Sequence, residues 1–143
     1  MIGLCAHKTL EIRFSDTDAM GVVWHGNYLK YFEDAREHFG ELFKLEYLLI
    51  HKHGFFVPIT DTSLKHLEPI YYGDNIQISI KFICTKAAKI QFEYVLKNLE
   101  TNNIVATGTT TQVFLNESSR DLVLYKPFFF KEWESKQNWI NVS

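Results

Sequence analysis

The feature of this sequence that most constrains its fold is a single change of hydrophobic period. Large apolar residues first recur at steps of three or four, at Tyr28, Phe32, Ala35, Phe39 and Leu42. This spacing is typical of an amphipathic helix. From Phe55 onward, apolar residues instead alternate with polar ones, which is the period of a β-strand. The chain therefore offers one long helix to cover several strands.

The segment before the helix also shows a short alternation. Leu10, Ile12 and Phe14 alternate with polar residues and predict a half-buried strand, preceded by a loose N-terminus. Asn27 stands directly before the helical stripe, and asparagine is a favoured helix N-cap. We therefore expect a strand, a loop and then a helix that begins at Asn27.

The later strands are separated by short turn signals. Alternation is clearest over residues 76–82 and 90–96. Over residues 105–115 one face carries every second residue: Val105, Thr107, Thr109, Thr111, Val113 and Leu115. Short connections imply antiparallel pairing, because parallel neighbours need long crossovers. An apolar sheet face must be covered, and one helix is available to cover it. The pattern predicts an α+β fold in which a curved antiparallel sheet of about five strands wraps around a long central helix.

Composition excludes several classes of protein. The chain has 143 residues, which suits a single domain over residues 1–143, with a C-terminal helix expected over residues 127–140. Its net charge of -2 gives no reason to expect a nucleic-acid partner. No apolar run approaches the length of a membrane span. With only Cys5 and Cys84, a disulfide framework is not expected, which favours a cytoplasmic location.

The stretch DTDAMGVVWHGNY, residues 16–28, carries the residues best suited to chemistry. It joins the predicted strand to the start of the helix, where unpaired backbone N–H groups suit a carbonyl oxygen that gains negative charge. Asp18 lies in a glycine-containing loop that could place its carboxylate near those groups. The structural alternative is that these residues only cap the helix and form turns. Spacing alone leaves both interpretations open.

The longer segment DTDAMGVVWHGNYLKYFEDAR resembles the signature of hotdog-fold acyl-CoA thioesterases of the 4-hydroxybenzoyl-CoA thioesterase type, particularly their YbgC-like branch. Tyr72-Gly73-Asp74 is similar to a hairpin of the same family. The resemblance implies a hotdog fold and hydrolysis of an acyl or aroyl thioester to free acid and CoA. One departure is Met20, where YbgC-like sequences tend to have glycine, and we expect its side chain to fill core space rather than to narrow the acyl pocket.

The resemblance also implies roles for individual residues. Asp18 corresponds to the family's catalytic carboxylate, acting as nucleophile or general base, and His25 assists it. The backbone N–H groups of His25 and Gly26 correspond to those that polarise the thioester carbonyl. Asp16 and Asn27 take supporting roles. A free aspartate has a pKa near ~3.9, so a base role requires a raised basicity, and the sequence leaves the two mechanisms open.

The substrate and the assembly are constrained less closely. Lys65, Lys86 and Lys89 are candidates to bind the phosphates of CoA. Coenzyme A would be part of substrate and product, so no separate cofactor is expected. No metal is expected either, because His51 and His53 lack a third ligand with suitable spacing. The partner would be acyl-CoA or an acyl carrier protein, and open sheet edges together with the resemblance favour a homo-oligomer, either a dimer or a tetramer built as a dimer of dimers.

Two rival functions fit the same expected fold. A hotdog enoyl-CoA hydratase or dehydratase would use an Asp/His pair for proton transfer at carbon. A non-catalytic acyl-carrier-binding hotdog protein would bind a thioester without turnover. The identity of the acyl group stays open in each case.

Overall fold

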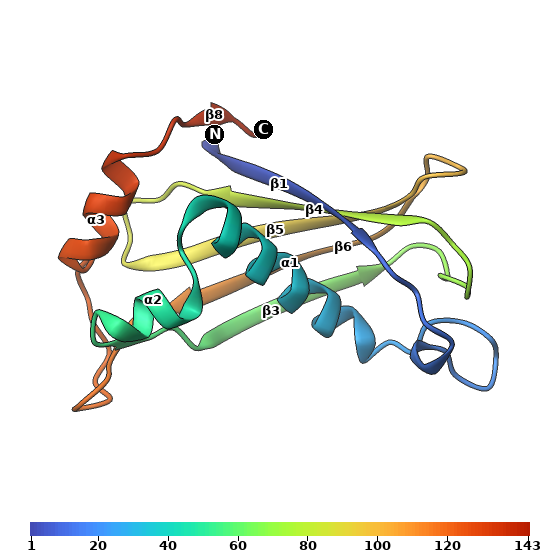
Figure 1. The fold of residues 1–143 in the computed structure, drawn as a ribbon, viewed down its shortest axis with the longest axis horizontal. Coiled ribbons are helices and arrows are strands. Elements are labelled where there is room, and N and C mark those ends of the chain that lie inside the picture. The colour runs from blue at the N-terminus through green and yellow to red at the C-terminus, as the bar shows by residue number, and fades with distance from the viewer.

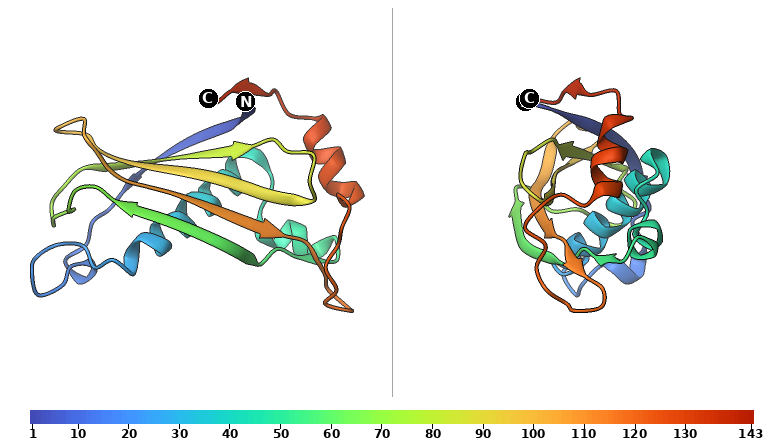
Figure 2. Two further views of the ribbon diagram at one scale, coloured as in Figure 1. Left: turned by 180° about the vertical axis from the view of Figure 1, so that it is seen from behind. Right: turned by 90° about the vertical axis from the view of Figure 1, so that its left-hand side faces the viewer.

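The computed structural model describes residues 1–143 and contains a six-stranded sheet with the order β3-β6-β5-β4-β1-β8. Its strands are β1 (Ile2–Leu10), β3 (Ile59–His66), β4 (Ile76–Ile83), β5 (Lys89–Asn98), β6 (Ile104–Val113) and β8 (Ile140–Asn141). The remaining elements are the 3-10 helix η1 (Phe14–Asp16), the helices α1 (Asn27–Phe43), α2 (Tyr47–Lys52) and α3 (Phe128–Ser135), and the short strands β2 (Phe55–Phe56) and β7 (Leu115–Asn116). Every pairing in the sheet is antiparallel, and α1 lies across its concave face (Figures 1 and 2). The predicted helix wrapped by a curved sheet is confirmed.

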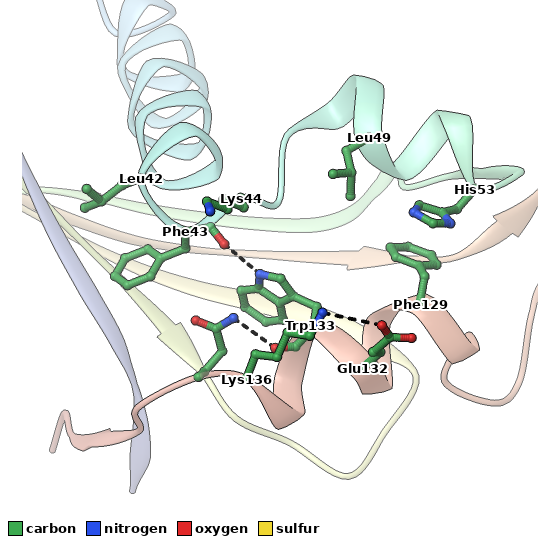
Figure 3. Close-up of a pocket in the computed structure, with 10 residues that line it drawn as sticks. Leu42, Phe43, Lys44, Leu49, His53, Phe129, Glu132, Trp133 and Lys136 are labelled. Carbon is green, nitrogen blue, oxygen red and sulfur yellow. Dashed lines mark hydrogen bonds and ion pairs between the residues drawn. The ribbon is translucent and has the colours of Figure 1, made fainter.

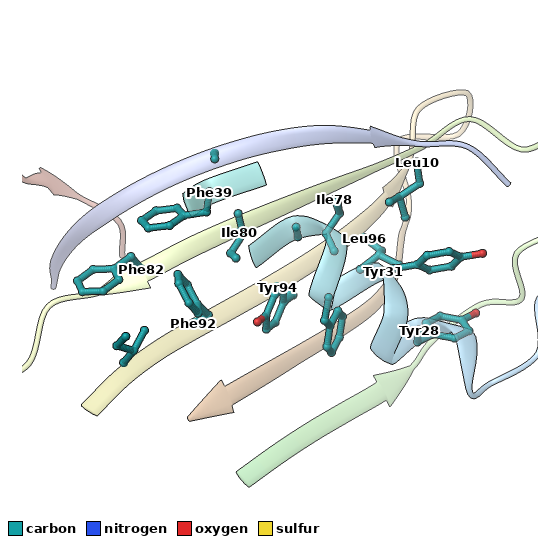
Figure 4. Close-up of a cluster of buried hydrophobic side chains, with 14 of the residues drawn as sticks. Leu10, Tyr28, Tyr31, Phe39, Ile78, Ile80, Phe82, Phe92, Tyr94 and Leu96 are labelled. Carbon is teal, nitrogen blue, oxygen red and sulfur yellow. The ribbon is translucent and has the colours of Figure 1, made fainter. Parts of the chain in front are cut away.

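The core lies between α1 and the centre of the sheet (Figure 4). Along β4 and β5, alternate residues are buried, as the sequence period predicts. Phe32 of α1 stacks on Tyr94 of β5 with ring centroids 4.1 Å apart. Gly108 of β6 makes this approach possible, because a Cβ atom there would lie 2.5 Å from the Phe32 ring. The central helix is thus held to the sheet largely by aromatic packing.

The N-terminal strand differs from its prediction. It spans Ile2–Leu10 and pairs along β4, so the segment expected to be loose forms part of the sheet. Ile12 is buried beyond the strand, whereas Phe14 lies in η1 and is 76% exposed. The hydrophobic alternation continues past Leu10, the last residue of β1 that pairs with β4. The period alone therefore does not show where the strand ends.

The inward face of β6 is the one opposite to its apparent stripe. Ala106, Gly108 and Thr110 are buried, whereas Thr109 is exposed and its hydroxyl hydrogen-bonds Ser63 of β3 at 2.6 Å. A register shift after Leu96 of β5 changes the phase of the pairing. Small side chains on the inward face leave room for α1.

The two edges of the sheet differ. The C-terminal helix ends at Ser135, short of the predicted residue 140. Ile140 instead lies in β8 and pairs with Gly3 of β1, so β8 covers that edge of the sheet. At the other edge, β3 pairs only with β6, and nearly all of its residues are exposed. None of the helices is both long and apolar enough to cross a bilayer.

Candidate active site

The segment between β1 and α1, residues 11–26, is called the Asp18 loop below. It folds into a small hairpin in which Thr17 pairs with Val23 and the Asp18 N–H donates to the Val22 carbonyl at 2.8 Å. The tip is a tight turn closed by the Gly21 N–H on the Asp18 carbonyl, and Gly21 has a φ of +79°, a conformation that favours glycine. The Val23 N–H donates to Ile70 at 2.7 Å and fixes the hairpin to the β3–β4 connection.

Asp18 occupies the first position of this turn and is half-buried. Its Oδ1 accepts a hydrogen bond from the Met20 N–H at 2.8 Å, whereas its Oδ2 has no partner within the chain. One oxygen therefore shapes the turn and the other is available to a ligand. The expectation that Met20 fills core space is wrong, because its side chain projects from the turn and is 78% exposed.

Asp16 connects the Asp18 loop to α1. Its Oδ2 accepts hydrogen bonds from the Arg13 N–H at 3.0 Å and from the Tyr31 hydroxyl at 3.1 Å. Its backbone carbonyl accepts two more, from the Trp24 N–H at 2.9 Å and the Asn27 Nδ2 at 2.8 Å. These four bonds orient Asp16 toward protein groups, so it braces the loop against the first turns of the helix.

The start of α1 differs in detail from the prediction. The N-cap is Gly26 and makes no side-chain capping bond, so Asn27 is not the cap. Asn27 is instead the first helical residue, and its buried side-chain amide donates a hydrogen bond to the Asp16 carbonyl. The N–H groups of His25 and Gly26 donate to no acceptor in the chain. The helix therefore begins with two free donors next to the braced loop.

The His25 side chain lies beside Trp24, with ring centroids 5.0 Å apart, and is exposed. It makes no hydrogen bond with Asp18, so the structure places the two residues on one loop without joining their side chains. A Cβ atom at Gly26 would overlap the Trp24 ring in its present position, so a larger residue there would require the Trp24 side chain to move.

The three lysines considered for CoA lie in different places. Lys65 is on β3 opposite Thr107, on the outer face of the sheet and near the end that holds the Asp18 loop. Lys86 and Lys89 are at the β4–β5 turn, whereas the Asp18 loop follows the opposite end of β1 (Figure 1). An eight-residue strand is about 26 Å long. Lys86 and Lys89 therefore lie far from Asp18 of the same chain, and contact between these lysines and the phosphates of CoA stays a prediction.

Two hollows lie next to α1. The first, of about 500 Å³, is between the C-terminal end of α1, α2 and α3, and Trp133 donates to the Phe43 carbonyl at 2.7 Å in its wall (Figure 3). It is at the far end of α1 from the Asp18 loop. The second is a groove of about 770 Å³ along the side of α1, floored by apolar residues of β5 and the segment before β3. Only the second extends along the middle of the helix toward its N-terminal half.

Two residues near the site were not identified from the sequence. Tyr31 is buried, and burial together with the neighbouring Asp16 carboxylate raises the pKa of its hydroxyl, which therefore stays protonated and able to donate. Arg36 lines the groove and donates to Tyr94 at 3.0 Å. Tyr31 lies four residues after Asn27, and this helical spacing would have placed both on the face toward the Asp18 loop. No comparable pattern marks Arg36.

The helix wrapped by an antiparallel sheet, with a carboxylate loop at the helix start, defines a hotdog fold. Residues 12–133 match the model of the thioesterase-like superfamily, and the chain belongs to that superfamily. It is 31% identical over 116 residues to a 1,4-dihydroxy-2-naphthoyl-CoA hydrolase of Thermosynechococcus vestitus, covering 78% of this chain and 77% of the relative. It is 24% identical to the putative acyl-CoA thioesterase YneP of Bacillus subtilis, covering 87% and 86%.

A solved structure agrees with this placement. The DHNA-CoA thioesterase of Staphylococcus aureus superposes with a TM-score of 0.82 at 25% identity, covering 92% of this chain and 89% of the other. Relatives of this chain are thus named as thioesterases and CoA hydrolases, and the chain is a thioester hydrolase of the acyl-CoA thioesterase family.

Proposed function

We propose that the protein hydrolyses an acyl or aroyl thioester of CoA at the Asp18 loop, with Asp18 as the catalytic carboxylate. The observation that carries the proposal is that a single loop holds both a free carboxylate oxygen, on Asp18, and free N–H groups, on His25 and Gly26 at the helix start. The Asp-Thr-Asp and Trp-His-Gly-Asn-Tyr residues support a place in the YbgC-like branch. Coenzyme A enters as part of the substrate and leaves as the thiol.

The chemistry needs few groups. The thioester carbonyl oxygen accepts from the N–H groups of His25 and Gly26, which stabilise the negative charge that develops on it. In one route, Asp18 attacks the carbonyl carbon, the carbon–sulfur bond breaks, and water then hydrolyses the mixed anhydride. In the other route, Asp18 takes a proton from the water that attacks. Both routes release one acid and one free thiol, and the exposed His25 ring can hold water or carry a proton.

We further propose that the working form is a homo-oligomer built on β3. This strand leaves a row of backbone donors and acceptors unpaired at an exposed edge, and a second copy could continue the sheet there. Molar mass measured by light scattering tests this assembly, and a monomer at micromolar concentration would refute it.

The test of activity is thiol release from a panel of acyl-CoAs and an acyl carrier protein thioester, followed with a chromogenic thiol reagent. Turnover that depends on Asp18 is the expected result. Loss of enoyl absorbance without thiol release would favour a hydratase instead. Saturable thioester binding without either signal would favour a non-catalytic binding protein.

A further inference from the structure

The outer face of the sheet carries a cysteine and a histidine that contact each other. Cys5 and His7 lie two residues apart on β1, so their side chains share one face of the strand. The residues that alternate with them, Leu4, Ala6 and Leu10, are buried in the core on the other face. The Sγ atom of Cys5 is 3.8 Å from the Nε2 atom of His7, which is within hydrogen-bonding distance for sulfur. A thiol and a base are therefore paired outside the candidate active site.

Ser79 holds the imidazole of His7 in one orientation. It lies opposite His7 in the register of β1 and β4, and its Oγ atom is 2.8 Å from Nδ1 of the ring. In the tautomer whose Nδ1–H donates to Ser79, the Nε2 atom presents a lone pair to the Cys5 thiol. A nucleophile, a base and a group that orients the base then lie side by side, which is the arrangement of an activated nucleophile.

The surroundings of Cys5 leave its thiol protonated but accessible. Burial raises the pKa of the thiol more than Lys81, its partner in register on β4, lowers it. The thiol therefore needs a base to become the reactive thiolate, and His7 lies next to it. Cys5 is only half-buried, and β8 pairs with β1 only at Ile2 and Gly3. The edge of β1 beside Cys5 therefore has no further strand next to it.

The other cysteine of the chain lacks this arrangement. Cys84 is also half-buried, and burial together with the Glu134 carboxylate raises the pKa of its thiol more than Lys126 lowers it. That carboxylate is itself bound through both oxygens to Lys126, and no imidazole contacts the Cys84 sulfur. The two thiols have similar exposure, but only Cys5 has a base in contact. They therefore provide a comparison within one molecule.

The groups around Cys5 suit a thioester of CoA as the reacting molecule. A thioester has an electrophilic carbonyl carbon and a good leaving group, and a thiolate is a strong nucleophile toward it. Lys81 belongs to none of the ion pairs in the chain, so its ammonium group is available to a phosphate of CoA. Acyl-CoA is also the substrate class of the function proposed above.

We propose that Cys5 is an acyl-acceptor site separate from the Asp18 loop, at which the thiol takes the acyl group from a CoA thioester. His7 removes the thiol proton, and Sγ attacks the thioester carbonyl carbon. The bond from that carbon to the CoA sulfur breaks, and the departing thiolate takes the proton from His7. The products are an S-acyl cysteine and free CoA. One thioester replaces another, so no oxidant is needed. The inference takes its substrate class from the proposed function and uses none of the residues of the Asp18 loop.

The experiment incubates the protein with octanoyl-CoA, measures the acyl adduct by intact mass and locates it by peptide mapping. Asp18→Asn is used beside wild type, because slow hydrolysis leaves the thioester intact during the incubation. One octanoyl group should appear on Cys5, and Cys84 should react at least about tenfold more slowly. Hydroxylamine should remove the group, since it cleaves a thioester and leaves an amide on lysine intact.

Variants on the Asp18→Asn background test the role of each group, and urea unfolding shows that each variant is folded. Cys5→Ser should abolish the adduct, whereas Cys84→Ser is the matched control and should keep it. His7→Gln should slow adduct formation at least about tenfold, because glutamine cannot take the thiol proton. Ser79→Ala should slow it a few-fold, and Ser79→Thr, which keeps the hydroxyl, should restore the rate.

The outcomes separate this proposal from the thioesterase function. Equal rates with and without His7, or an adduct only on Cys84 or on lysine, would overturn the role of Cys5. Absence of any adduct while wild type turns over octanoyl-CoA would overturn it as well and leave the thioesterase function standing. An adduct on Cys5 in a protein without Asp18-dependent turnover would support the role of Cys5 and refute the thioesterase function alone.

Discussion

Replacement of Asp18 by asparagine separates the turn-forming role of this residue from its proposed chemical role. The Oδ1 atom accepts the Met20 N–H at 2.8 Å, and an asparagine side chain keeps an oxygen at that place. The turn should therefore survive, and the free energy of unfolding should change by less than about 0.5 kcal/mol. Alanine would remove the acceptor and cost about 1 kcal/mol.

The effect on turnover should be much larger. An amide is neither a nucleophile nor a base here, and a lost catalytic group of this kind lowers the rate about 100-fold or more. That factor corresponds to at least about 2.7 kcal/mol in the activation barrier. The predicted kinetic cost of Asp18→Asn thus exceeds its predicted stability cost about fivefold.

Thiol release measured beside urea unfolding tests both halves of this prediction. Asp74→Asn is a matched control, because Asp74 accepts the Tyr71 N–H at 2.8 Å in a neighbouring turn and should keep wild-type turnover. Near-normal thiol release by Asp18→Asn would remove Asp18 from the mechanism. A loss of turnover in proportion to a loss of folded protein would show that Asp18 acts only through the turn.

Three further changes test the brace of the Asp18 loop, the packing of the core and an ion pair at α3. Tyr31→Phe should lower turnover a few-fold by loosening the loop. Because the pKa of Tyr31 is raised above its ordinary value of 10.0, the stability that this hydroxyl contributes is present below pH 10.0 and is lost as the pH rises above it, by up to about 1.4 kcal/mol per pH unit. Urea unfolding of the variant at alkaline pH should therefore depend less on pH than that of wild type. Gly108→Ala places a Cβ 2.5 Å from the Phe32 ring and should cost about 1–3 kcal/mol, whereas an unchanged urea midpoint would mean that the core is looser than described. Lys126 and Glu134 form an ion pair with an N···O distance of 2.9 Å, and their side chains are only 14% and 13% exposed. Glu134→Gln removes one charge of this pair and should lower the free energy of unfolding by about 2 kcal/mol in the same urea assay. A variant as stable as wild type at every salt concentration would contradict this prediction.

The central sheet could be predicted from the sequence because its strands have one apolar face. Alternate residues of β4 and β5 are buried, as their period indicates. The N-terminal strand could not be placed in the same way, because Ile2–Ala6 is apolar or small throughout and shows no alternation. The alternation that does follow it ends in η1, where exposed Phe14 lies outside the sheet. Pairing partners decide such boundaries, and period does not report them.

The candidate site, too, could be predicted from the sequence only in part. Local sequence indicates a carboxylate loop before a helix, since aspartate, glycine and asparagine have strong preferences for such positions. Which aspartate faces protein and which faces outward depends on contacts across the fold. Asp16 reaches Tyr31, fifteen residues away, and this contact depends on the angle at which the helix leaves the loop. Resemblance to a family distinguishes the two aspartates, whereas the residue pattern alone does not.

The two aspartates have complementary arrangements of hydrogen bonds. Asp16 uses its Oδ2 and its carbonyl oxygen to accept four bonds, and every donor belongs to the loop or to α1. Asp18 accepts only from donors inside its own turn, the Met20 N–H on Oδ1 and the Gly21 N–H on its carbonyl oxygen, and keeps Oδ2 free. Because the bracing is concentrated on Asp16, Asp18 can present an oxygen without the loop relying on it for attachment to the helix. A proposed reactive carboxylate needs such a support, since an oxygen that was also required to hold the loop could not form and break bonds to a substrate without moving the loop.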